Sequence, residues 1–317
     1  MWLKALFQTH LDLSVKLSTT HQAYIYERPG SWMPAADRAA LTRALNDVAE
    51  RSLPAGPLDY GVFREDSGAL ARSVIMLIRE RESGRPVAFN ALALLDVSHR
   101  GSPEIVTHLG LVLIDPEARG KGFSWALYGM TTLLLFARNQ LRPFWISSVT
   151  QVPAVVGLVC EGFSNVFPSP HAGALRRFDH LALARQIMRH HRAAFGVSGD
   201  ARFDDERFVI EDSYRGGSDH LKKRFEEAPP HRDPAYNDFC AVQLDYDRGD
   251  DLLQIGEMNL AAARHYLLQD VPRHSLPALI GTMAFLLVQR AVLPVLYWLS
   301  PGRAWGRLRP WRENNHV

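Results

Sequence analysis

Cysteine is scarce in this 317-residue chain, and neither sign of charge prevails. Only Cys160 and Cys240 are present, outside any CxxC pair or His/Cys cluster with zinc spacing, which excludes a disulfide framework and a structural zinc. The net charge is +2, so the chain does not have the strong positive electrostatic field of a nucleic-acid-binding protein. Hydrophobic residues make up 47% of the chain. We therefore expect a folded protein of about two domains' length, with no metal and no nucleic-acid partner.

The N-terminal stretch lacks the unbroken apolar core of a signal peptide. Within residues 1–17, charged side chains such as Lys4, Asp12 and Lys16 interrupt the apolar ones, which is an amphipathic pattern. This pattern predicts a cytoplasmic protein.

Apolar periodicity predicts strands and helices in mixed order. Strands are predicted at 22–27, 73–78, 86–97, 104–114, 143–149, 163–167, 207–211, 239–246 and 252–255, and helices at 34–53, 124–139, 153–161 and 181–195. Residues 82–85 have turn composition and predict a hairpin, and the polar stretch 215–234 predicts a loop, either over a site or as a surface excursion. Together these elements predict an α/β or α+β fold with a mixed central sheet flanked by helices.

The sharpest motif is a glycine-containing turn over residues 114–124, between an apolar strand and an apolar helix. Gly120 and Gly122 let successive backbone N–H groups converge, and the helix N-terminus adds partial positive charge, so main chain can bind a pyrophosphate. Arg119 and Lys121 add further positive charge. The alternative is an ordinary turn in which glycine serves geometry alone.

This turn is neither a Walker A loop, because the four-residue gap and the Gly-Lys-Ser/Thr ending are missing, nor the GxGxxG fingerprint. It resembles the acyl-CoA loop of the GNAT superfamily of N-acetyltransferases, Arg/Gln-x-x-Gly-x-Gly/Ala. Arg119, Gly122 and Ser124 occupy the defining positions, with serine in place of Gly/Ala. The preceding step of residues 114–116 also matches, as an apolar-x-Pro sequence.

A second match lies downstream, where GNAT members often read Asn-x-x-Ala, then a helical Tyr, then Gly-Phe. Gln151, Ala154, Leu158 and residues 162–163 fall at these spacings. The resemblance covers residues 60–170, about a third of the chain.

The resemblance implies a mixed sheet whose fourth and fifth strands splay apart, with the pantetheine arm of acetyl-CoA or a longer acyl-CoA in the gap. The backbone of Leu111 and Leu113 would pair with the pantetheine amides. The implied donor-binding residues are Leu111, Leu113, Arg119, Gly120, Lys121, Gly122, Phe123, Ser124 and Gln151. The implied segments are an N-terminal helical, acceptor-side region (1–58), the acyl-CoA-binding core (59–170), an α/β extension (171–256) and a helical segment (257–317).

Acyl transfer to an amine needs a base for the ammonium and an acid for the leaving thiolate. Glu104 and His108 share one strand face and are our predictions for the base. The alternative is a hydrogen-bonded core histidine and a solvated glutamate. Leu158 stands at the usual Tyr position and cannot donate a proton. Tyr128 or the serine pair 147–148 could serve instead, or CoA leaves as thiolate.

The C-terminal half contains an acidic stretch that could hold a cationic amine acceptor, the alternative being a solvated face with turn-forming aspartates. Its members are Asp204, Asp205, Glu211, Asp212, Asp245, Asp247, Asp250 and Asp251.

Residues 276–299 are strongly apolar and long enough to cross a bilayer, but Arg290 would cost about 2.5 to 3.5 kcal/mol there, and two prolines interrupt the run. Arginine and tryptophan follow at 303–312, as in an interfacial anchor. The sequence leaves two readings open: peripheral contact with the inner face of a membrane, or packing on the core or on a second subunit of a homodimer.

These patterns predict an acyltransferase that moves an acyl group from acyl-CoA to an amine, hydroxyl or lipid-linked acceptor by direct attack. Two alternatives stay open: a non-catalytic acyl-CoA sensor or scaffold of the same fold, and a structural protein with no affinity for CoA.

Overall fold

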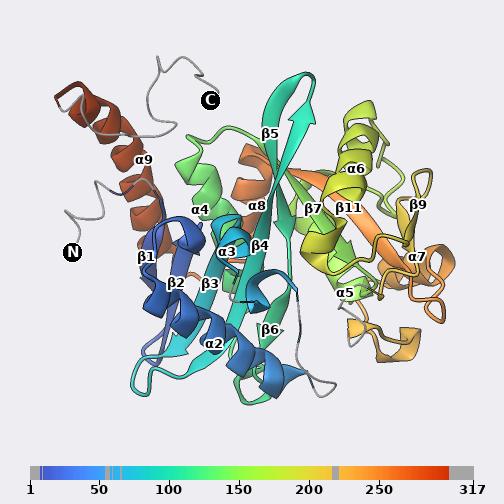
Figure 1. The fold of residues 1–317 in the computed structure, drawn as a ribbon, viewed down its shortest axis with the longest axis horizontal. Helices are drawn as coiled ribbons and strands as arrows, with labels where there is room; N and C mark the ends of the chain where they lie inside the picture. Colours follow the sequence, from blue (N-terminus) through green and yellow to red (C-terminus); the bar gives the residue numbers. More distant parts are fainter. Residues whose placement is uncertain are drawn as a thin grey trace.

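The computed structural model describes residues 8, 10–53, 58, 60–64, 66–215 and 221–299. A mixed sheet runs through these residues with the strand order β1-β2-β3-β4-β5-β7-β11-β10-β9, while β6 pairs with β4 and β8 with β11 (Figure 1). The strands are β1 (Asp12–Lys16), β2 (His21–Glu27), β3 (Ser73–Glu80), β4 (Pro86–His99), β5 (Ser102–Leu109), β6 (Val112–Ile114), β7 (Phe144–Thr150), β8 (Ser164–Phe167), β9 (Arg202–Asp204), β10 (Val209–Glu211) and β11 (Asp251–Met258). The predicted mixed sheet is therefore confirmed.

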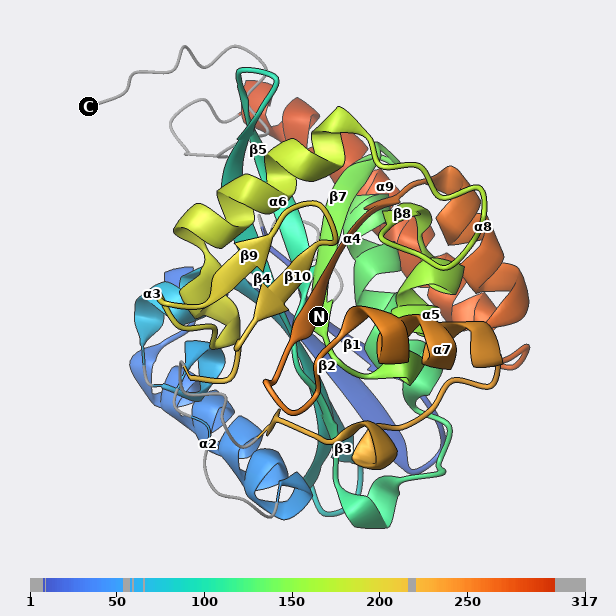
Figure 2. The ribbon, with the colours of Figure 1, turned by 90° about the vertical axis from the view of Figure 1, so that its right-hand side faces the viewer.

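Helices cover both faces of the sheet (Figure 2). One face carries α2 (Ala35–Ser52), α3 (Ser67–Ala71), α6 (Phe178–His190) and the short 3-10 turns η2 (Gly61–Phe63) and η5 (Arg192–Phe195). The other carries α4 (Thr131–Arg138), α5 (Pro153–Gly162), α7 (Pro234–Gln243), α8 (Leu260–Gln269) and α9 (Leu276–Leu299). The alternation along β3 explains this: Met76 and Ile78 pack on the α4 side, Ile75 and Leu77 on the α2 side.

Two predicted elements are broken at glycines. The predicted strand 104–114 divides into β5 and β6, because a Cβ on Gly110 would lie 2.1 Å from the carbonyl oxygen of Ala91, so the chain passes too close to β4 for an ordinary strand residue. The predicted helix 124–139 contains a π-helical turn, η4 (Ala126–Met130), before α4. Gly129 in that turn lies against the ring of Tyr266, 2.0 Å from the position of a Cβ. Tertiary contacts cause both irregularities.

The predicted strand 239–246 is wrong. Residues 234–243 form α7, whose N-cap Asp233 accepts a hydrogen bond from the Ala235 N–H at 3.0 Å and is followed by a proline at the first helical position. The apolar residues of this stretch, among them Tyr236 and Cys240, pack as one helix face. Residues 247–250 therefore lie between a helix and β11.

Helix α9 has the bounds of the apolar run and packs on α4. None of the described helices is both long and apolar enough to cross a bilayer. The polar pair in the middle of α9 faces the protein: Gln289 is buried and donates to the Gln8 carbonyl at 2.9 Å, and Arg290 donates to the Arg138 carbonyl at 2.7 Å. Its opposite side exposes Ile280, Leu287, Val288 and Val295. The Arg/Trp stretch 303–312 lies outside the described residues, and peripheral membrane or dimer contact stays a prediction.

Candidate functional site

A cavity of about 1210 Å³ lies where β5 and β7 part. The two strands pair in parallel only over residues 107–109 and 146–148, after which β6 stays with β4 while β7 continues beside β11. Residues 109–114 line one side of the cavity and residues 148–152 the other. This is the gap between splayed strands that the resemblance implies. Residues 221–229 of the polar loop contribute Leu221, Lys223, Glu227 and Pro229 to the lining.

The cavity reaches through the sheet from one face to the other. Tyr128 of η4 lines it on the face covered by α4, and Phe63 of η2 lines it on the face covered by α2. Leu111 and Leu113 lie between them. β4 takes up one edge of β6, and the opposite edge faces the cavity with no partner strand among the described residues. An extended ligand with amide groups can hydrogen-bond to such an edge.

The glycine loop begins where β6 ends. Gly120 and Gly122 have φ angles of +76° and +74°, and a Cβ on either would meet no atom within 4 Å. Glycine is therefore required for backbone conformation, not for space. Within the described chain the backbone N–H groups of Gly120, Gly122 and Phe123 donate to no acceptor, and they precede the helix that begins at Ser124. Unpaired donors beside a helix N-terminus are the components of an anion site.

Two cations flank these donors. Arg119 and Lys121 are exposed, and neither forms an ion pair with any described residue. Lys223, half-buried in the cavity lining, is likewise without an ion pair among them. Positive charge that no carboxylate neutralises favours binding of a phosphate group. Phe123 serves differently, because its side chain is 6% exposed and packs edge-on to His21 in the core.

The base of the loop is fixed by ion pairs of a buried carboxylate. Asp115 is 1% exposed and accepts from Arg51 Nε at 2.6 Å and Arg85 Nη2 at 2.7 Å. It also caps the following 3-10 turn by accepting from the Glu117 N–H at 3.0 Å. Burial alone would raise the pKa of Asp115, but the hydrogen bonds from the two arginines outweigh it and lower that pKa. The loop thus leaves the sheet at a fixed angle.

The helix after the loop is fixed to the sheet through its π-helical turn. A π-helical turn shifts the hydrogen-bond register and frees carbonyl groups for other donors. Buried Asn90 of β4 donates to the Leu127 carbonyl, and the Tyr266 hydroxyl donates to the Trp125 carbonyl at 2.6 Å. These bonds hold Tyr128 at the cavity.

His108 lies at the point where the strands part. It is 2% exposed, its Nδ1 lies 3.0 Å from Ser147 Oγ, and its ring stacks on Phe195 at 4.7 Å. Burial lowers its pKa to about 4, so the ring is neutral at physiological pH. Nε2 has no hydrogen-bond partner among the described residues and is available to a ligand. A neutral imidazole in a cavity can accept a proton.

Of the other residues considered for catalysis, only some line the cavity. Tyr128 lines the cavity, and burial raises the pKa of its hydroxyl, which has no partner in the described chain. Glu104 lies four residues before His108 on β5, toward the hairpin tip, and is not among the residues that line the cavity. Leu158 on α5 is also outside the lining, where Val155 stands. The geometry brings His108 and Tyr128 to one cavity and leaves Glu104 out.

A carboxyl group that the sequence patterns did not single out lies in the same cavity. Asp251, the first residue of β11, is 4% exposed and accepts from the Ser213 hydroxyl at 2.6 Å and the Tyr214 hydroxyl at 2.8 Å. Burial raises its pKa to about 6 despite these two bonds. Tyr60 and Tyr214 line the cavity beside it, and burial together with the charge of Asp251 raises the pKa of both. A carboxylate among tyrosine rings can bind an ammonium group.

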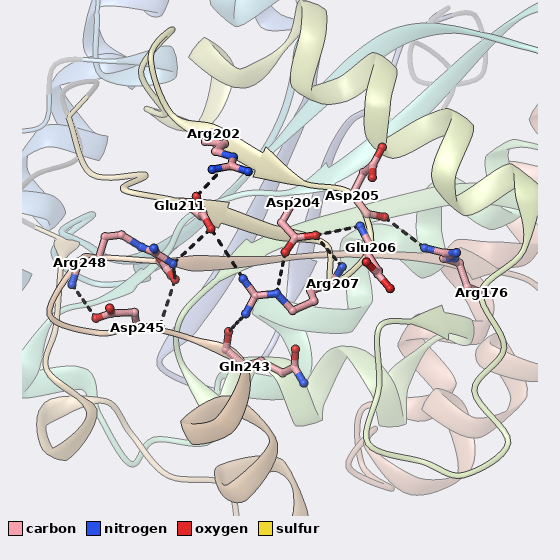
Figure 3. A network of polar contacts seen from close by, with 11 residues as sticks. Arg176, Arg202, Asp204, Asp205, Glu206, Arg207, Glu211, Gln243, Asp245 and Arg248 are labelled. Atoms are coloured by element: carbon pink, nitrogen blue, oxygen red, sulfur yellow. Dashed lines mark hydrogen bonds and ion pairs between the residues drawn. The ribbon is translucent and has the colours of Figure 1, made fainter.

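Most of the acidic stretch forms a surface network instead (Figure 3). Arg207 Nε lies 2.6 Å from Asp204 Oδ2, and Arg207 and Arg248 both approach Glu211, at 3.7 Å and 3.4 Å. Asp250 is buried but is paired with Arg248 at 2.7 Å. The solvated-face alternative thus describes most of the stretch, and Asp251 is the member that lines the cavity.

Gln151 lies at the end of β7, where the second GNAT-like motif begins. It is 1% exposed, lines the cavity and donates through Nε2 to the Leu221 carbonyl at 3.0 Å. Its Oε1 is buried without a partner among the described residues, and its backbone carbonyl accepts from the Tyr246 hydroxyl at 2.6 Å. A buried amide oxygen without a donor costs about 1–3 kcal/mol unless a ligand supplies one.

No protein-family model matches the sequence, and no curated protein matches it significantly. Solved acetyltransferase structures are among those that match parts of the fold. An acetyltransferase from Trypanosoma brucei is 21% identical, with 38% of this chain and 76% of that chain covered and a TM-score of 0.24. A spermidine/spermine N-acetyltransferase from Vibrio cholerae is 16% identical (46% and 79% covered, TM-score 0.29). A ribosomal-protein-S5-alanine acetyltransferase from Vibrio fischeri is 10% identical (77% and 96% covered, TM-score 0.32).

Proposed function

We propose that this protein is a GNAT-type acyltransferase that moves an acyl group from acyl-CoA to an amine by direct attack. The observation that carries the proposal is the continuity of three features: a glycine loop with unpaired N–H groups, the free edge of β6, and a cavity that crosses the sheet. The pyrophosphate would bind residues 119–124, and Arg119 and Lys121 would compensate its charge. The pantetheine arm would then run back along β6 past Leu113 and Leu111.

The thioester would reach the point where the strands part. β6 runs toward the loop, so a ligand whose phosphates lie at the loop approaches Gly110 and His108 with its other end. His108 Nε2 is the group we assign to accept the proton that the nitrogen loses once it has attacked the thioester as a neutral amine, because attack makes this nitrogen much more acidic than a free ammonium. Tyr128 is the hydroxyl in the lining that can protonate the leaving thiolate.

Asp251 supports an amine acceptor over a hydroxyl. Leu252, which follows Asp251 on β11, pairs with Thr150 of β7, and His108 of β5 pairs with Ser147 of β7. Measured along β7, Asp251 therefore lies about four residues, or ~13 Å, beyond His108. At that distance Asp251 cannot take the proton from a nitrogen beside His108. Its role would be to attract a cationic acceptor into the cavity.

Calorimetric titration with acetyl-CoA tests the donor site through a matched pair of variants. Gly122→Asp puts a negative side chain into the open space where the pyrophosphate would lie. We expect its affinity for acetyl-CoA to fall at least about ten-fold, which corresponds to 1.4 kcal/mol.

Gly101→Asp is the control. Gly101 also has a positive φ, +79°, and open surroundings, but it lies at the tip of the β4–β5 hairpin, at the end of β4 far from the glycine loop. It should bind acetyl-CoA like the wild type. Equal losses in both variants would mean that backbone strain, not the phosphate site, explains the effect. Binding without transfer to any amine would favour the acyl-CoA sensor, and absence of binding in the wild type would refute the donor site.

A further inference from the structure

We propose that the donor carries a medium or long acyl chain, and that this chain lies in an apolar hollow over Ala91 and Ala93 of β4, here called the alanine hollow. This inference rests on the proposed function. The cavity of about 1210 Å³ also includes the end at Asp251 that would receive the acceptor, so the support for a longer acyl chain comes from the shape of the other end of the cavity and not from the total volume.

The floor of the hollow follows from the alternation of side chains along β4. Phe89, Ala91, Ala93 and Leu95 point to the face covered by α2 and α6, where the first two pack with the core under α2 and the last two with the core under α6. On this face two small alanine side chains follow one another, so a depression forms between the larger side chains of Phe89 and Leu95. Both alanines and Leu95 line the cavity.

The walls of the hollow are mostly apolar, and the half-buried His191 that also lines the cavity has its Nε2 2.7 Å from the Asp96 carbonyl oxygen. Val62 and Phe63 of η2 and Phe195 of η5 line the hollow, and the two turns meet, since a Cβ on Gly61 would lie 3.6 Å from the Ala194 carbonyl oxygen. The charged lining residues at this end, Asp66, Arg72 and Asp96, are exposed and therefore lie at the rim. An alkyl chain on the floor would not desolvate them.

The hollow continues the path of the donor. The Ala91 N–H donates to the Leu111 carbonyl at 3.1 Å, and Ala93 is the register partner of His108. A donor that runs from the loop along β6 therefore passes Leu111 and places its thioester beside His108. The next atoms of a longer acyl group lie over Ala93 and point toward Leu95, away from the side on which Asp251 would receive the acceptor.

Calorimetry with a series from acetyl-CoA to decanoyl-CoA tests this assignment on the full chain. Burial of each methylene is expected to tighten binding roughly four-fold until the hollow is filled. The readout is the ratio of the affinities for decanoyl-CoA and acetyl-CoA within one protein, so that a general loss of donor binding cancels. Ala93→Phe fills the floor and should bring this ratio close to one.

Ala69→Phe narrows the hollow from the half-exposed position 69 of α3 and gives a second test should Ala93→Phe, in the central strand β4, prevent folding. It should lower the ratio in the same direction. A wild-type ratio near one would overturn the long acyl chain while leaving the donor site intact. A high ratio that neither variant lowers would overturn its placement over the alanines. Failure of every CoA ester to bind would refute the proposed function itself.

Discussion

Asp251 makes the free energy of unfolding depend on pH, and Asp251→Asn should remove this dependence. Full burial raises the pKa of this carboxyl from 3.8 to about 6, although the hydroxyls of Ser213 and Tyr214 oppose the rise. The folded state therefore binds the proton more tightly than the unfolded chain. The resulting stability is fully present below about pH 4 and is lost as the pH rises through about 6. A rise of about two pKa units corresponds to roughly 3 kcal/mol.

Urea unfolding of wild type and variant, measured from pH 4 to 7.5 at constant ionic strength, gives the difference in unfolding free energy at each pH. Other groups titrate alike in both proteins, so the difference isolates Asp251. We expect the stability of the wild type relative to Asp251→Asn to fall by roughly 2.5 kcal/mol across this range, because at pH 4 the unfolded chain has already lost part of its protons.

Tyr214→Phe supplies a matched check, because it removes one of the two hydrogen bonds that favour the ionised carboxyl. Its unfolding free energy should fall more steeply with pH than that of the wild type. A wild-type-minus-Asp251→Asn difference that stays constant, or rises with pH, would refute the reasoning, since Asp251 would then ionise as readily in the fold as in the unfolded chain.

Two further substitutions test the scaffold. Arg138→Met should destabilise the protein by about 3–5 kcal/mol, because Arg138 Nε lies 2.9 Å from a Glu27 carboxylate that would remain largely buried without its partner; urea unfolding measures the loss, and a change below about 1 kcal/mol would contradict it. Gly129→Ala should cost about 1–3 kcal/mol through overpacking on the Tyr266 ring, and the cost should shrink in a Tyr266→Ala background. Equal costs in both backgrounds would show that the clash does not govern the π-helical turn.

The sequence predicted those elements whose cause is local. The turn composition of residues 82–85 predicts the hairpin of β3 and β4, and the one-sided apolar spacing of residues 34–53 predicts α2. Both patterns act through neighbours in sequence, so the chain alone carries the information. The loop over residues 114–124 was also predictable from the sequence, because two glycines between a strand and a helix indicate backbone angles that other residues rarely adopt.

Contacts between distant segments decided the rest. The division of β5 from β6 depends on how close Gly110 comes to β4, and the residues that line the cavity come from segments that only the fold brings together. In sequence, Asp251 is one acidic residue among many. Other members of the acidic stretch, such as Asp204, pair with arginines at the surface, whereas Asp251 lies in the cavity because β11 takes its place beside β7. Burial, which raises its pKa, is a property of the packed sheet and not of the residue.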